Sequence, residues 1–103
     1  MTPAEAWLRE RVADTPPELL DAMIRALPGE GEVPEALAAG AVELYRAVLA
    51  GNGRREDAYP LLAADALFTH ALEAQAEADP DGVAHFAQRW GGAGKLGALA
   101  ASG

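Results

Sequence analysis

Several residue types that carry chemistry are scarce or missing in this sequence of 103 residues. There is no cysteine, which excludes disulfides, thiolate zinc sites and a thiol nucleophile. Ser102 is the single serine, and it lies in a glycine- and alanine-rich C-terminal segment. Most hydrolase arrangements need a serine or cysteine nucleophile placed beside a base, so they are excluded.

Positive charge is also scarce. The chain has 8 lysines and arginines against 16 acidic residues, a net charge of −8, and its largest basic cluster is Arg54–Arg55. A nucleic-acid partner is therefore not expected, because binding to phosphates needs a basic footprint. No window approaches the ~20 apolar residues of a membrane span, and the N-terminus is charged where a signal peptide is apolar. We expect a soluble, cytoplasmic protein without a membrane partner, and the abundance of alanine, glycine and arginine suggests a bacterial source.

The local signals that are present are those of helices. Two segments match the capping box with proline at the first helical position: Thr2-Pro3-Ala4-Glu5 and Thr15-Pro16-Pro17-Glu18. Asp79-Pro80 indicates a further start, and stops are expected at Pro28-Gly29, Gly51-Asn52-Gly53 and Gly91-Gly92. No alternating β-branched run indicates a strand. The sequence therefore predicts an all-α protein.

The apolar periodicity predicts a compact bundle of about five helices, at about 3–14, 16–27, 34–50, 55–78 and 80–90. Residues 1–91 form one domain, and 92–103 form a Gly/Ala-rich tail in which Leu96 and Leu99 are the residues able to dock. The inward faces are expected to carry the large apolar side chains of each helix, among them Leu8, Met23, Leu37, Tyr45, Leu49, Phe86 and Trp90.

The helix at 55–78 is apolar on two faces, which places it at the centre of the bundle or at a subunit interface. Projection at about 100° per residue puts Asp65 among its bulkiest side chains, with Thr69 beside it. The other face consists of small residues and one leucine: Ala63, Leu67, Ala71 and Ala74. We expect part of this stripe to be bare and to form the interface of a homodimer.

Asp65 is the unusual residue of this helix, because a carboxylate in an apolar setting is costly unless it is hydrogen-bonded or paired. Thr69 and Tyr45 are the candidate donors, and Arg11 is the candidate cation. One interpretation is a structural polar contact that sets the helix register. The other is a binding site in which Asp65, Tyr45 and Thr69 orient a ligand or handle a proton.

His70, Glu73 and Glu77 follow one another at helical spacing, so a carboxylate-rich metal site is conceivable. Helical bundles, however, build such sites from Glu-x-x-His motifs on facing helices, and this sequence has none. A solvated helix edge is the expected role. We therefore expect no metal, no cofactor and no catalytic residue.

The segment "PLLAADALFTHALEA", from Pro60 to Ala74, resembles a helix of the trans-polyprenyl diphosphate synthases that often reads "LLAGDALLTLAFE". Members of that family are all-α and dimeric and bind isoprenoid diphosphates through Mg²⁺ held by DDxxD motifs. This chain has no adjacent aspartates, and Ala64 stands where the family has glycine. The resemblance thus implies no catalytic residue. It implies that Asp65 and Thr69 lie on a helix packed deep in the fold.

These observations favour a non-catalytic interaction or structural module over an enzyme. Two alternatives stay open at this point. One is a carrier of an apolar ligand, with a cavity between the third and fourth helices and Asp65 or Tyr45 at its mouth. The other is a metal-binding or enzymatic helical protein that uses Asp65, His70 and Glu73.

Overall fold

The structure, a computed structural model, describes residues 1–51 and 58–91. Within these ranges the chain forms five α-helices and one short 3₁₀ helix, with no strand. The elements are α1 (Pro3–Arg11), α2 (Pro17–Arg25), α3 (Val33–Ala50), α4 (Ala58–Ala78), η2 (Pro80–Gly82) and α5 (Val83–Trp90). The predicted all-α bundle is confirmed. The expected helical residues 55–57 and the expected tail 92–103 lie outside the described residues.

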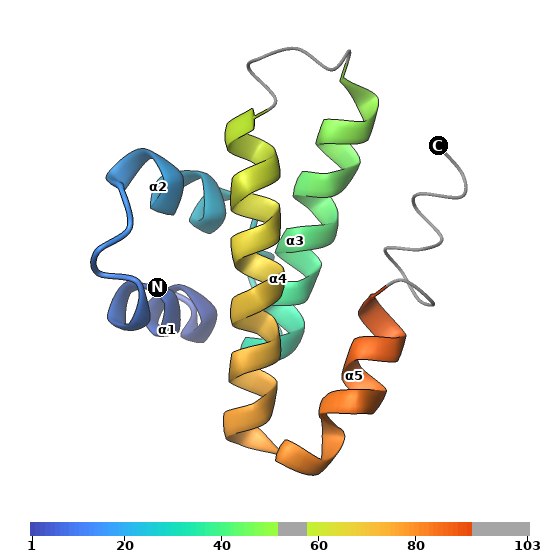
Figure 1. Ribbon diagram of the computed structural model, residues 1–103. Coiled ribbons are helices and arrows are strands. Elements are labelled where there is room, and N and C mark those ends of the chain that lie inside the picture. Colours follow the sequence, from blue (N-terminus) through green and yellow to red (C-terminus); the bar gives the residue numbers. More distant parts are fainter. Residues whose placement is uncertain (52–57, 92–103) are drawn as a thin grey trace.

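The long helices α3 and α4 run antiparallel, side by side, and form the centre of the molecule (Figure 1). Helices α1 and α2 lie on one side of α4, and η2 turns the chain so that α5 returns on the other side (Figure 1). α4 packs against α2, α3 and α5, and its His70 ring contacts Trp7 of α1. Its predicted central position is confirmed.

The first helix begins as predicted and ends earlier. The side chain of Thr2 accepts a hydrogen bond from the Glu5 N–H at 3.2 Å, which satisfies one of the free amides at the helix start. The helix was expected to reach residue 14, but it ends at Arg11, and Val12 leaves the helical conformation with its side chain buried in the core. A longer helix would have to continue toward Thr15, whose helical conformation is disfavoured by the following proline.

The predicted cap of the second helix is wrong. Thr15 was expected to cap a helix starting at Pro16, but Pro16 is itself the capping residue and Pro17 is the first helical one. The reason is the pair of prolines, since a residue before proline is pushed into an extended conformation, and Pro16 has ψ 139°. This helix start has no side-chain hydrogen bond.

Small residues let α3 and α4 approach closely. Gly40 on α3 faces Leu67 on α4, and a Cβ added to Gly40 would lie 3.1 Å from the Leu67 side chain and 3.2 Å from that of Leu27. The largest fully buried side chains are Leu8, Met23, Leu37 and Leu67. Ala63, Leu67 and Ala71 are 0% exposed and Ala74 is 4% exposed, so the small-residue stripe belongs to the core of the single chain.

No helix among the described residues is long and apolar enough to cross a bilayer.

Candidate functional site

Tyr45 and Asp65 join the two central helices. The Tyr45 hydroxyl donates a hydrogen bond to a carboxylate oxygen of Asp65, as expected from the sequence. Asp65 is exposed, however, so the expectation that it lies inside the apolar core is wrong. The angle around α4 explains the difference, because Asp65 is about 160° from Leu67, which faces α3. The one partly buried member of the pair is Tyr45.

The third candidate, Thr69, does not contact the carboxylate of Asp65. Its hydroxyl donates to the main-chain oxygen of Asp65 at 3.0 Å, the local bond that threonine commonly makes to the preceding turn of a helix. The hydrogen bond needs no partner outside α4, and Thr69 is exposed. The three candidate residues therefore do not converge on one point.

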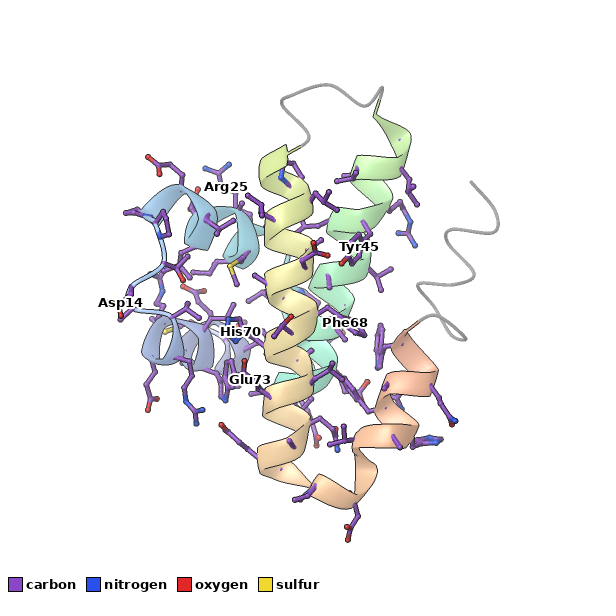
Figure 2. The ribbon with its side chains drawn as sticks, viewed as in Figure 1. Asp14, Arg25, Tyr45, Phe68, His70 and Glu73 are labelled. Atoms are coloured by element: carbon purple, nitrogen blue, oxygen red, sulfur yellow. The ribbon has the colours of Figure 1, made fainter. Side chains whose placement is uncertain are left out.

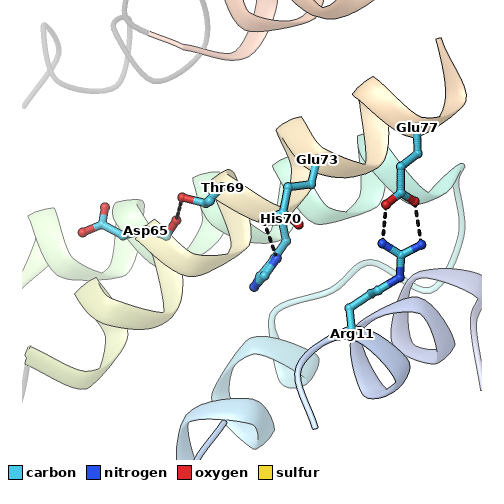
Figure 3. A network of polar contacts seen from close by, with 6 residues as sticks. All are labelled: Arg11, Asp65, Thr69, His70, Glu73 and Glu77. Carbon is cyan, nitrogen blue, oxygen red and sulfur yellow. Dashed lines mark hydrogen bonds and ion pairs between the residues drawn. The ribbon is translucent and has the colours of Figure 1, made fainter. Parts of the chain in front are cut away.

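Arg11 was the expected cation for Asp65, and this expectation is also wrong. Arg11 forms a two-pronged ion pair with Glu77, in which the Nη2–Oε1 distance is 2.8 Å. Figure 3 shows this pair at the end of α4 opposite to Asp65, whose side chain points away from it. The hydrogen bond to Glu77 raises the pKa of Arg11, and the hydrogen bond from Arg11 lowers the pKa of Glu77.

His70 lies between α1 and α4. It was expected on a solvated helix edge, but its side chain is largely covered. Its ring contacts Trp7 edge-on, with the ring centroids 5.9 Å apart, and its side chain is 21% exposed. Nδ1 lies 3.2 Å from a carboxylate oxygen of Glu73, without hydrogen-bond geometry (Figure 3). Arg11 stacks on Trp7, with its guanidinium carbon 5.0 Å from the ring centroid. The packing of His70 against Trp7 thus holds α1 against α4.

The structure offers no support for the metal site considered from the sequence. Among the described residues, no group of three or more histidine, aspartate and glutamate side chains could hold a metal ion. His70 and Glu73 are neighbours, but the carboxylate of Glu77 is occupied by Arg11 and by a hydrogen bond from Trp7. The cluster is a contact between helices.

A group of exposed leucines, which the sequence did not predict, lies where α3 ends and α4 begins. Leu49 is 52% exposed, Leu61 is 41% exposed and Leu62 is 56% exposed. Leu49 was expected to face inward, and Leu61 and Leu62 belong to the bulky side chains around Asp65 that were expected to pack on the apolar face of α4. A signal was available in the sequence, because both helices carry wider apolar arcs than the short helices α1, α2 and α5 can cover.

Tyr45 and Phe68 lie on the side of α4 that faces α5, whereas His70 and Glu73 lie on the side of α1 (Figure 2).

The carrier hypothesis placed a cavity between α3 and α4, but these helices pack directly through Gly40 and Leu67. A hollow of about 330 Å³ lies between α2 and α3 instead, open to solvent. It is lined by Ala22, Arg25, Ala26, Glu43, Leu44 and Ala47.

Comparison of the chain with protein-family models, with curated proteins and with solved structures found no match in any of the three. The resemblance to the trans-polyprenyl diphosphate synthases therefore stays a prediction. The exposed position of Asp65 differs from the deep packing that this resemblance implied.

Removing the Tyr45–Asp65 hydrogen bond should cost little stability. We expect Asp65→Ala and Tyr45→Phe each to lower the free energy of unfolding by about 0.5–1 kcal/mol, because one partner is exposed and water replaces it. Asp65→Asn, which keeps an acceptor oxygen, should lower it less. Urea denaturation of the single and double variants measures the coupling. A loss above about 3 kcal/mol for Asp65→Ala would show that Asp65 is buried after all.

The free energy of unfolding should fall at alkaline pH because of the ionisation of Tyr45. Its partial burial, and then its hydrogen bond to Asp65, raise the pKa of Tyr45 above the ordinary 10.0. The unfolded chain then releases the phenolic proton before the folded chain does, so the stabilisation is complete below pH 10 and declines above it. Urea midpoints at increasing pH should fall less steeply for Tyr45→Phe than for the wild type. Equal slopes would contradict the prediction.

Proposed function

We propose that this chain is a non-catalytic protein-interaction module that forms a homodimer through the exposed leucines where α3 ends and α4 begins. One observation supports the proposal. The exposed large hydrophobic side chains among the described residues are Met1, Leu49, Leu61 and Leu62, and three of these four lie at that end of the α3–α4 pair. Scattered exposed leucines are ordinary on a monomer, whereas grouped ones commonly mark an interface.

Leu62 is the centre of the proposed dimer surface, since it is the most exposed of the three leucines. The stripe of Ala63, Leu67, Ala71 and Ala74, which the sequence suggested as the interface, is buried inside the chain. The proposed dimer surface therefore lies on another side of α4. The net charge of −8 opposes association, but salt screens it beyond about 8–10 Å at physiological ionic strength.

Light scattering at micromolar concentration tests the dimer. We expect a mass of twice the monomer's 10.7 kDa. Leu62→Glu should return the mass to that of the monomer, because it places a charge at the centre of the interface. Ala76→Glu, an exposed position on the same helix, is the matched control and should leave the dimer intact. A wild-type monomer would refute the dimer, and a dimer that survives Leu62→Glu would place the interface elsewhere.

The hollow between α2 and α3 supports a second candidate, a carrier of a small apolar ligand. Its volume of about 330 Å³ lies at the lower end of the range for ligand sites, and its lining combines three alanines and Leu44 with Arg25 and Glu43. Native mass spectrometry of protein purified from its own host tests this function. A bound organic mass that is lost in Ala47→Trp would support it.

We propose a cytoplasmic, bacterial setting for either function. The absence of cysteine is compatible with a reducing compartment, and the preference for arginine over lysine, with abundant alanine and glycine, supports the bacterial source.

A further inference from the structure

An apolar strip follows the line along which α3 and α4 meet on the α5 side. The hydrogen bond from Tyr45 to Asp65 gives the register of the two antiparallel helices. One helical turn from this pair toward the loop, Leu49 comes opposite Leu61. One turn in the other direction, Val42 comes opposite Phe68. The strip therefore continues past the Tyr45–Asp65 pair on both sides.

Helix α5 covers one half of the strip and shows what kind of element fits it. Phe86 and Trp90 of α5 are 3% and 7% exposed, and Val42 of α3, which belongs to the same core cluster, is 8% exposed. At the rim, Arg89 of α5 forms an ion pair with Glu35 of α3. The cover is thus a short amphipathic helix with large side chains turned inward and an arginine beside an acidic residue of the central pair.

The other half of the strip is open. α5 ends beside Phe68, since a Cβ added to Gly91 would lie 3.7 Å from the Phe68 ring. Beyond this point Leu49 and Leu61 are 52% and 41% exposed. Asp65 lies between them and the end of α5, and Tyr45 holds its carboxylate at the strip. Within residues 1–51 and 58–91, the ion pairs of the arginines go to other acids: Arg9 to Glu5, Arg11 to Glu77, Arg25 to Asp21, Arg46 to Glu43 and Arg89 to Glu35.

We infer that the open half of this strip, made of Tyr45, Leu49, Leu61, Asp65 and Phe68, binds a short, basic amphipathic helix of another protein. The bound helix continues the line of α5, places leucine or aromatic side chains between Leu49 and Leu61, and sets an arginine or lysine against Asp65. Laying an amphipathic helix along an apolar surface is a common recognition mode, with anchors three and four residues apart. The net charge of −8 attracts a basic partner at long range.

A second copy of this chain is the poorer occupant. A two-fold axis through the strip would bring the two Asp65 carboxylates toward each other, and like charges at an interface core oppose association. The strip shares Leu49 and Leu61 with the leucine group of the proposed dimer surface, but Leu62, the centre of that surface, lies about 100° around α4 from Leu61. A change at Leu62 therefore tests the dimer without altering the strip.

The test uses the full chain and two fluorescein-labelled helical peptides. Both carry leucines three and four residues apart on one face; one has arginines beside the leucines and the other has glutamates there. Fluorescence anisotropy should show that the arginine peptide binds about tenfold or more tightly than the glutamate peptide, and less tightly as salt rises. Leu61→Glu and Leu49→Glu should each weaken binding about tenfold or more, because both anchors are central. Asp65→Asn should weaken it up to about fivefold.

Leu62→Glu is the control, since it is expected to split the homodimer and to leave peptide binding unchanged. Circular dichroism confirms that each variant keeps its helix content. Binding that is indifferent to Leu61→Glu or to the sign of the peptide charge would overturn the inference. Peptide binding that appears only when Leu96 and Leu99 are both replaced by glutamate would also overturn the inference, because the chain's own residues 92–103 would then be what occupies the strip. The inference would also be overturned if Leu49→Glu or Leu61→Glu splits the dimer and the wild-type chain binds no peptide. The strip would then be the binding surface for a second copy.

Discussion

Ala71→Glu should unfold this protein. Ala71 is 0% exposed and belongs to the small-residue stripe of α4 that lies in the core. A glutamate at this position would be larger than the space that alanine leaves, and its charge would be buried without a partner. We expect circular dichroism at 222 nm to lose most of its helical signal and limited proteolysis to become rapid.

The size of this effect follows from the margin of stability. Domains of this length are stable by about 5–15 kcal/mol, whereas burying an unpaired carboxylate costs several kcal/mol even after relaxation, and overpacking adds about 1–3 kcal/mol. Ala76→Glu makes the same change at an exposed position of the same helix. It should keep the fold, with a loss of a few tenths of a kcal/mol from the like charge of Glu73, three residues before it. A folded, monomeric Ala71→Glu would show that the stripe is an interface and not a core.

Leu67→Ala should give the second largest loss. Leu67 is fully buried, and its side chain lies against Gly40 of α3, where a Cβ would come within 3.1 Å of it. Removing it leaves a cavity at the closest approach of the two central helices. We expect a loss of about 2–5 kcal/mol in the free energy of unfolding and a fall in Tm of roughly 10 °C or more.

Leu62→Ala is the matched control for Leu67→Ala. The two leucines lie on the same helix, but Leu62 is 56% exposed, so its truncation should change the stability of the monomer by less than about 0.5 kcal/mol. Urea and thermal denaturation below the concentration of dimer formation measure both variants. Equal losses would contradict the placement of Leu67 in the core.

The signals that were read correctly from the sequence are local. Thr2 caps α1 through the N–H of Glu5, three residues away. Phe86 and Trp90 face inward as expected, because the helical period alone sorts side chains within a helix. One contact between helices was expected as well: the carboxylate of Asp65, on an apolar arc, needs a donor, and Tyr45 lies on the facing helix.

The tertiary structure decided which of the two apolar faces of α4 is covered. The sequence shows both the face of Leu67 and the face of Asp65, but periodicity carries no information about the neighbouring helix. Gly40 lets α3 approach Leu67 closely, and this buries the small-residue stripe. Helix α5 ends at Trp90, beside Phe68, so the strip from Asp65 to Leu61 stays exposed.

The partner of Arg11 was likewise decided by packing. The sequence alone does not determine whether Arg11 forms an ion pair with Asp65 or with Glu77, because both acids are distant from it in the sequence and lie on the same helix. α1 packs on the side of α4 that carries His70, where the Trp7 and His70 rings meet, and this brings Arg11 to Glu77. Local periodicity thus determined which residues share a face of each helix. The lengths and contacts of the neighbouring helices determined which faces are buried, which are open and which charges meet, since burial depends on partners distant in the sequence.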